Sequence, residues 1–158
     1  MNTTHSRGAE GRRVTTRDGH NTLVIDLDGL PGSVRGARHA TADFLTGARI
    51  RRRLDASDAA VSDVLLVVAE LVANACRHAP GPCRLTVTLT DAAADVAVRD
   101  TGRGHLRITR QTTARTGGYG LLIVARLTGG IHVLPSPDGK TVRASVPLPG
   151  PSPRLTLV

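Results

Sequence analysis

A long helix with one broad apolar face limits the folds that this chain can adopt. Ser57 or Asp58 can cap a helix that runs to about His78, before Gly81 and Pro82 end it. Apolar residues recur in this helix at steps of three and four: Val61, Val64, Leu65, Val68, Leu71, Val72 and Ala75. They form one face, which has to pack against another element of structure.

Alternation of apolar and polar residues predicts that a sheet covers this face. Residues 85–90 and 94–99 alternate on either side of a turn centred on Asp91, as the strands of a hairpin do. Ser33 is expected to cap an earlier helix. In full, we expect strands at 22–27, 85–90, 94–99, 131–134 and 141–148, and further helices at 34–48 and 119–127. The order β-α-α-β-β-α-β-β indicates an α+β fold, a two-layer sandwich in which helices cover one face of a mixed sheet.

Length and composition indicate one domain. The 158 residues can bury a single hydrophobic core, which we assign to residues 22–148. Residues 1–21 are polar and without periodicity and predict a flexible tail, and residues 149–158, with three prolines, predict a short C-terminal extension. The apolar runs are too short to span a membrane, and the N-terminus lacks a hydrophobic signal region. We therefore expect a cytoplasmic protein without a membrane partner.

The charge and the rare residue types bear on the class of partner. The formal net charge of +8 is typical of proteins that bind nucleic acid. The surplus is spread along the chain, however, and Phe44 and Tyr119 are the only aromatic residues that could stack on bases. Both facts argue against nucleic-acid binding. Cys76 and Cys83 have no companion cluster of metal ligands, which indicates reduced structural thiols.

Three polar residues, Glu70, Asn74 and His78, are spaced by four on the helix that ends near residue 78. They could form an ordinary solvated face. Asn is a poor residue for a helix interior, however, and this side of the helix is less polar than a solvent face usually is. An Asn amide oxygen can take one coordination position on Mg²⁺. A Glu carboxylate can accept a proton from an attacking hydroxyl or water, or orient it.

Asp100 ends a predicted strand and is followed by Gly102 and Gly104. This pattern could be a simple Asp/Gly turn. It is also what a site needs in which Asp100 accepts a hydrogen bond from an exocyclic amine such as that of adenine. The two glycines would then allow main chain to approach the ligand closely.

A second glycine cluster, Gly117, Gly118 and Gly120, leads into the apolar helix at 119–127. It could be a plain linker. A glycine-rich loop at a helix N-terminus also presents free N–H groups to phosphate. The intervening residues 105–116 contain three arginines, among them Arg115, and no acid, which suits a lid over a triphosphate.

Gly139-Lys140-Thr141 imitates the end of a phosphate-binding P-loop. Leu134 occupies the position of the first glycine of that motif, and a strand is expected where the motif has a helix. This segment therefore does not predict a P-loop.

The ordered set of Glu70 and Asn74, Asp100 with Gly102 and Gly104, Gly118 with Gly120, and residues 139–141 resembles the Bergerat-fold ATP-binding module of histidine kinases and DNA gyrase. The match covers roughly residues 22–148. Within that superfamily, residues 67–79 and 120–124 are most similar to the small anti-sigma-factor serine kinases, including the stand-alone ATP-binding regulators of actinomycetes.

The resemblance implies a role for each of these residues. Glu70 would be the general base or the water-orienting group, and Asn74 would be the Mg²⁺ ligand. Asp100 would read adenine, helped by the hydroxyl of Thr141. The other implied contacts are Gly102 and Gly104 at the adenine pocket, Gly118 and Gly120 at the phosphates, and Arg115 or another arginine of the lid at the terminal phosphate.

The resemblance further implies ATP and Mg²⁺ as cofactors and a protein-serine kinase that is also an anti-sigma switch. Such a protein sequesters a sigma factor and phosphorylates an anti-sigma factor antagonist at Ser or Thr, and a homodimer is plausible. Two alternatives stay open. One is a nucleotide-gated interaction module without catalysis, and the other is a detached histidine-kinase-type ATPase domain.

Overall fold

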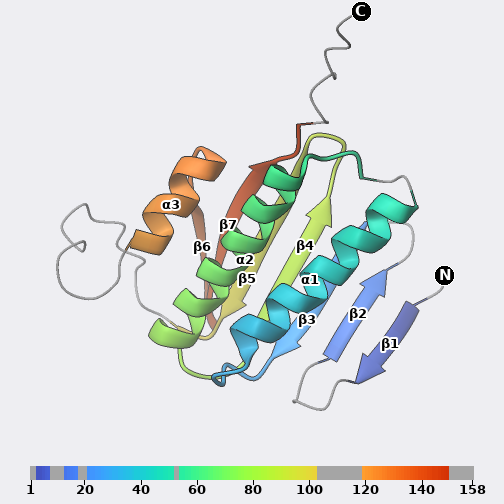
Figure 1. The fold of residues 1–158 in the computed structure, drawn as a ribbon. Coiled ribbons are helices and arrows are strands. Elements are labelled where there is room, and N and C mark those ends of the chain that lie inside the picture. The colour runs from blue at the N-terminus through green and yellow to red at the C-terminus, as the bar shows by residue number, and fades with distance from the viewer. Residues whose placement is uncertain (1–2, 8–12, 18–20, 52–53, 103–118, 150–158) are drawn as a thin grey trace, which may run out of the picture.

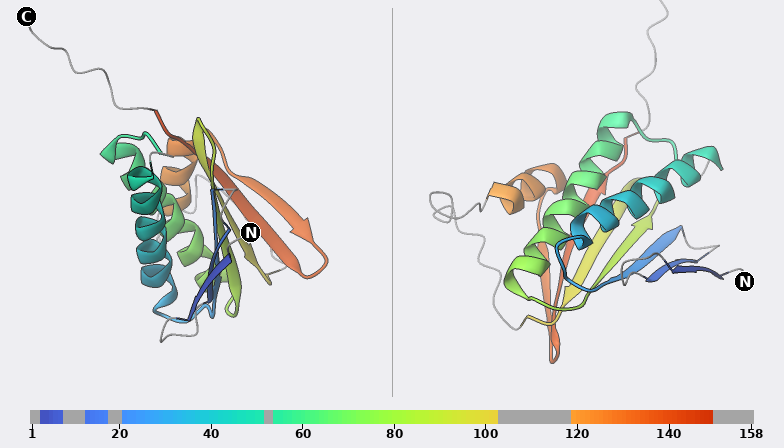
Figure 2. Two further views of the ribbon diagram at one scale, coloured as in Figure 1. Left: turned by 90° about the vertical axis from the view of Figure 1, so that its right-hand side faces the viewer. Right: turned by 60° about the horizontal axis from the view of Figure 1, so that its bottom comes forward.

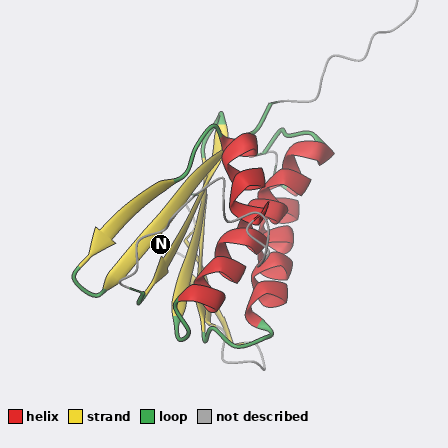
Figure 3. Ribbon diagram, turned by 90° about the vertical axis from the view of Figure 1, so that its left-hand side faces the viewer, coloured by secondary structure: helices red, strands yellow, loops and turns green. Residues whose placement is uncertain are grey.

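The computed structural model describes residues 3–7, 13–17, 21–51, 54–102 and 119–149. These residues form two layers, a sheet and three helices on one of its faces (Figures 1 and 2). The view in Figure 3 shows the separation directly, with the strands on one side and the helices on the other. The predicted α+β two-layer sandwich is therefore confirmed.

The helices are α1 (Ser33–Ile50), α2 (Asp58–His78) and α3 (Tyr119–Thr128). The strands are β1 (Thr3–Arg7), β2 (Arg13–Arg17), β3 (Thr22–Leu27), β4 (Cys83–Leu89), β5 (Ala93–Asp100), β6 (His132–Ser136) and β7 (Gly139–Pro147). They form one seven-stranded sheet in the order β1-β2-β3-β4-β5-β7-β6.

The sheet is antiparallel at every pair of neighbouring strands that the structure describes, so the prediction of a mixed sheet is wrong. Strands β5 and β6 run in the same direction, but they are not neighbours. The chain crosses from β5 to β6 through α3 and then returns as β7, which pairs with both. Strand β7 therefore lies between the two strands that run in the same direction.

The prediction of a tail at residues 1–21 is wrong for β1 and β2. These strands pair with each other, and β2 pairs with β3 with Val14 opposite Ile25. Val14 is the only apolar residue in the two strands, so the sequence carries no periodicity from which to predict them. Their pairing depends on the main-chain hydrogen-bonding edge that β3 offers, which is a property of the assembled sheet.

Helix α2 is the centre of the helical layer. It crosses the middle of the sheet in Figure 1 and packs against α1 on one side and α3 on the other. Ser57 caps it as predicted, because its side chain accepts a hydrogen bond of 3.1 Å from the amide of Ala60. By length and composition α2 could also cross a membrane. In this fold its apolar side chains, such as Val64 and Val68, are buried against the sheet.

Helix α1 begins differently from the prediction. Its N-cap is Gly32, and Ser33 is the first helical residue. The Ser33 hydroxyl instead donates to Oδ1 of Asp28 at 2.8 Å, and the amide of Leu30 donates to the same oxygen at 2.9 Å. The hydrogen bonds from Leu30 and Ser33 lower the pKa of Asp28. They fix the turn that leads from β3 into the helical layer.

Candidate functional site

Asp100 is the last residue of β5 and is 2% exposed. It lies on the helix-facing side of the sheet, on the same face of the strand as the buried Val96 and Val98. Its Oδ1 accepts hydrogen bonds of 2.8 Å from both the amide of Gly102 and Nζ of Lys140. Its Oδ2 is buried and has no hydrogen-bond partner among the described residues. A buried carboxylate oxygen without a partner is costly, so Oδ2 marks a position where a ligand could donate a hydrogen bond.

Lys140 stands opposite Asp100 in the register of β5 and β7. The two side chains form an ion pair of 2.8 Å and are 6% and 1% exposed. Nζ of Lys140 also donates to the carbonyl oxygen of Gly102 at 3.3 Å. Lys140 had no role in the sequence-based prediction, which assigned the contact from this segment to Thr141. The signal that could have found it is alternation, which places Lys140 on the same face of β7 as the buried Val142.

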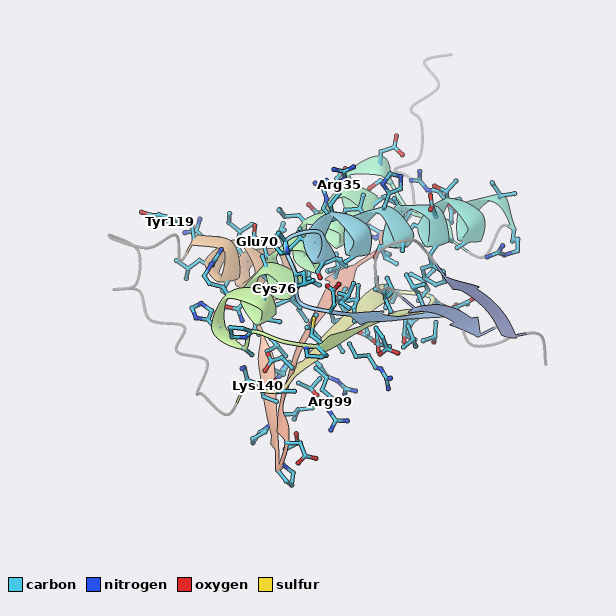
Figure 4. The ribbon with its side chains drawn as sticks, turned by 90° about the horizontal axis from the view of Figure 1, so that it is seen from below. Arg35, Glu70, Cys76, Arg99, Tyr119 and Lys140 are labelled. Atoms are coloured by element: carbon cyan, nitrogen blue, oxygen red, sulfur yellow. The ribbon has the colours of Figure 1, made fainter. Side chains whose placement is uncertain are left out.

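The structure places Thr141 on a different face of the sheet from Asp100, and its predicted role at adenine remains a prediction. Successive residues of a strand point to opposite faces, and Lys140 occupies the helix-facing side. Thr141 therefore lies on the other face, next to Arg99 in the register. Arg99 extends from the sheet on the side away from the helices (Figure 4). The partner of Asp100 on β7 is the lysine and not the threonine.

Two glycines allow the main chain to close around this ion pair. A Cβ added at Gly139 would overlap the main-chain oxygen of Asp100, and Gly139 has a φ of +150°. A Cβ added at Gly102 would lie 2.7 Å from Cβ of Ala79 and 2.9 Å from Nζ of Lys140. In the structure, the main chain at Gly102 packs closely against the side chains of Ala79 and Lys140. Ala79 directly follows α2, so this contact brings the end of α2 to the end of β5.

Asn74 and Glu70 lie one turn apart on α2. Asn74 is buried, at 5% exposed, and Glu70 is half-buried. The Glu70 carboxylate rests on the first turn of α3, because a Cβ added at Gly120 would overlap its Oε2. The fold therefore brings Glu70 into contact with Gly120, the residue of the second glycine cluster that the structure describes. His78, the third residue of the predicted face, is exposed.

Part of the predicted site falls on residues that the structure does not describe. Gly104, Arg115, Gly118 and the proposed lid at 105–116 all lie outside the described residues. Their roles remain predictions.

Cys76 and Cys83 form a thiol pair beneath this part of α2. Cys76 is on α2 (Figure 4), Cys83 begins β4, and each thiol affects the pKa of the other. Both are free cysteines. Burial raises the pKa of Cys83 from its ordinary value of 9.0 to about 12, and the charges of Cys76 and Asp100 act in the same direction. Burial also raises the pKa of Cys76.

The raised pKa predicts an unreactive thiol at Cys83. At pH 8 its thiolate fraction should be roughly a thousandfold below that of an ordinary cysteine, so iodoacetamide should alkylate it far more slowly in the folded protein than in urea. The folded state keeps this proton between pH 9 and about 12, whereas the unfolded state loses it. Stability should therefore fall as the pH rises above 9. Cys83→Ala should flatten this part of the profile, and equal alkylation rates in the folded and unfolded protein would rule out a protected thiol.

Comparison with known proteins shows the family of this chain. Residues 27–146 match the family model of the histidine kinase-like ATPase domain. The chain belongs to the histidine kinase-like ATPase domain family. This membership confirms the expected place in the GHKL, or Bergerat-fold, superfamily. At the level of the family, the chain is a kinase-type ATPase domain, and such domains bind ATP.

Two relatives of this ATPase domain come from Mycobacterium tuberculosis. A sensor histidine kinase component, HK1, is 35% identical, and the match covers 57% of this chain and 67% of the relative. A probable sensor histidine kinase, HK, is also 35% identical, and the match covers 57% of this chain but 30% of the relative. The chain thus spans less than a third of the second relative.

A solved structure with the same fold contains the RsbU and RsbW domains of a Mycobacterium tuberculosis protein. It superposes with a TM-score of 0.58 at 20% identity, over 82% of this chain and 33% of the solved one. At this identity the likeness shows the fold of the ATPase domain alone.

Proposed function

We propose that this chain is a Mg-ATP-dependent protein-serine/threonine kinase and anti-sigma factor, which phosphorylates an anti-sigma factor antagonist. The observation that carries the proposal is the unpartnered Oδ2 of Asp100, buried where β5 ends in a kinase-type ATPase domain. Different residues would bind the adenine base, hold the metal ion and assist phosphate transfer.

The chemistry of Oδ2 suits adenine. A carboxylate oxygen only accepts hydrogen bonds, and the exocyclic amine of adenine is a donor. Guanine and hypoxanthine carry a carbonyl at the same ring position, which would face Oδ2 with a second acceptor. A buried acceptor left without a donor costs about 1–3 kcal/mol. The site at Asp100 should therefore favour adenine nucleotides.

The donor set suits a magnesium ion that arrives with the nucleotide. Among the described residues no group of three or more His, Cys, Asp or Glu side chains could hold a metal by itself. Asn74 would offer one amide oxygen, and Mg²⁺ commonly takes few protein ligands beside phosphate oxygens and water. When bound, the ion would neutralise charge on the phosphates.

Glu70 is positioned for the transfer step. Its carboxylate is half-buried against Gly120, in the first turn of α3. The first N–H groups of a helix have no partner within the helix and can donate to phosphate. In the proposed reaction, a Ser or Thr hydroxyl of the antagonist attacks the γ-phosphorus while the bond to the β–γ bridging oxygen breaks. ADP leaves, and Glu70 accepts the hydroxyl proton.

The protein partners follow from two similarities. The RsbW-containing structure has the same fold, and residues 67–79 and 120–124 resemble the anti-sigma-factor serine kinases. A sigma factor, an antagonist, a homodimer and a cytoplasmic location are part of this proposal. The second candidate is the ATPase domain of a histidine kinase, and the names of the two relatives favour it.

Phosphate transfer from radiolabelled Mg-ATP distinguishes these functions. The chain would be incubated with candidate antagonist proteins and, separately, with the phospho-accepting domain of a sensor histidine kinase. Acid-stable label on the antagonist supports the serine kinase, whereas acid-labile label on a histidine supports the second candidate. ATP binding with no transfer to either protein supports a nucleotide-gated interaction module.

Glu70→Gln tests the assignment of the base. We expect transfer to slow by about 10²–10⁴-fold while ATP affinity is retained, because general-base catalysis contributes a factor of this size. Asp63→Asn is the matched control, since it removes a partly exposed carboxylate from the same helix. Transfer at the wild-type rate in Glu70→Gln would remove Glu70 from the mechanism.

A further inference from the structure

The lysine beside Asp100 is exceptional in this chain. Lys140 is the only lysine in the sequence, and the other twenty of its 21 basic residues are arginines. It is also the one basic side chain that is buried within the described part of the chain. The single lysine of this arginine-rich chain therefore lies next to the carboxylate that is proposed to bind adenine.

The geometry explains why an arginine would not serve here. An ammonium group is compact and has three N–H donors, whereas a guanidinium is a wide planar fork. Nζ uses two of its donors, on Oδ1 of Asp100 at 2.8 Å and on the carbonyl oxygen of Gly102 at 3.3 Å. A single Cβ added at Gly102 would already lie 2.9 Å from Nζ. On the side of Gly102, the space around the charge leaves no room for a larger group.

The contacts divide the two oxygens of Asp100 between different tasks. Oδ1 accepts from Lys140 and from the amide of Gly102, so the protein occupies it. Oδ2 is equally buried and has no partner within the described residues. The ammonium also offsets the charge of the carboxylate, which would otherwise be buried without a counterion.

We propose that Lys140 is a positioning residue for base selection. By holding Oδ1 of Asp100, it keeps Oδ2 as a fixed, charged acceptor, and this acceptor admits a purine with an amine at position 6 and rejects one with a carbonyl there. The inference rests on the proposed nucleotide site. Without Lys140, Oδ1 keeps only the amide of Gly102 as a donor, so the carboxylate can turn in the site. A carboxylate that can turn no longer holds Oδ2 against the base at position 6, so the variant loses selectivity and not only affinity.

The test compares ATP with inosine triphosphate, which presents a carbonyl at position 6. Calorimetry on the full chain would measure both affinities in the presence of Mg²⁺. The wild type should prefer ATP by about a hundredfold or more, because the wrong base leaves Oδ2 unpaired. In Lys140→Met, which keeps the length of the side chain, this ratio should fall by about tenfold or more. A purely structural role for Lys140 would weaken both nucleotides together and leave the ratio unchanged.

Arg143→Met is the matched control. It removes one positive charge from the same strand, but its side chain is exposed on the other face of the sheet. The ratio of its affinities for ATP and inosine triphosphate should equal that of the wild type. An equal fall in Arg143→Met would assign the effect to net charge and overturn the proposal.

A second measurement needs no variant. Because the chain has one lysine, protein labelled with ¹⁵N-lysine gives one side-chain ammonium signal in an NMR spectrum. Mg-ATP should shift this signal more than Mg-inosine triphosphate does at saturation. An unmoved signal with bound ATP overturns the role of Lys140 even if Lys140→Met does not fold. A wild type that binds neither nucleotide overturns the proposed function, whereas ATP binding with an unchanged ratio in Lys140→Met overturns the inference alone.

Discussion

Asp100→Asn is expected to lower the affinity for Mg-ATP by about a hundredfold, which corresponds to roughly 3 kcal/mol. Lys140 and the amide of Gly102 both donate to Oδ1, so they will hold the carboxamide oxygen in that place. The NH₂ group then replaces Oδ2, and a donor faces the exocyclic amine of adenine. The substitution therefore inverts the hydrogen-bonding character of the site while it keeps the size of the side chain.

The control for this prediction lies on the same strand. Asp95→Asn also removes one carboxylate from β5, but Asp95 is exposed and far along the strand from the site. Its affinity for ATP should equal that of the wild type. Thermal unfolding of both variants would show whether they remain folded. Wild-type affinity in a folded Asp100→Asn protein would mean that the base is read elsewhere.

Gly139→Ala is expected to destabilise the fold by about 3 kcal/mol or more. Gly139 opens β7 at a φ of +150°, which an alanine adopts only with strain. The added Cβ would also overlap the main-chain oxygen of Asp100. Main chain cannot move aside as a flexible side chain can, so β5 and β7 would have to separate at the site.

Gly130→Ala separates the two causes of this loss. Gly130 has a similar φ of +159°, but nothing lies within 4 Å of the position of its Cβ. This variant therefore measures the strain alone, at about 1–2 kcal/mol. Urea unfolding of both proteins gives the difference, which we assign to the overlap with Asp100. Equal losses in the two variants would show that β7 and the end of β5 are not packed as closely as described.

The helical layer could be predicted well because local signals decide it. The apolar spacing and the cap at Ser57 fixed the ends of α2, and alternation located β4 and β5. The errors arose where distant residues decide the outcome. The strands β1 and β2 form against an edge supplied by β3, and the antiparallel sheet results from where the hairpin of β6 and β7 inserts. Neither is encoded in a short window of sequence.

The same distinction applies to the candidate site. The sequence was enough to predict that Glu70 and Asn74 lie one turn apart on a helix and that Asp100 ends a strand. The ion pair of Asp100 and Lys140 could not be predicted in this way, because 40 residues separate its members and only the register of β5 and β7 brings them together. A shift of one position on β7 separates Lys140, which pairs with Asp100, from Thr141, which lies on the other face of the sheet.

A structure of the chain with Mg²⁺ and a non-hydrolysable ATP analogue tests the account most directly. The exocyclic amine of adenine should lie within hydrogen-bonding distance of Oδ2 of Asp100, with the ion bound to the side-chain oxygen of Asn74. An analogue seated elsewhere, with Oδ2 still unpartnered and Asn74 away from the metal, would contradict the account.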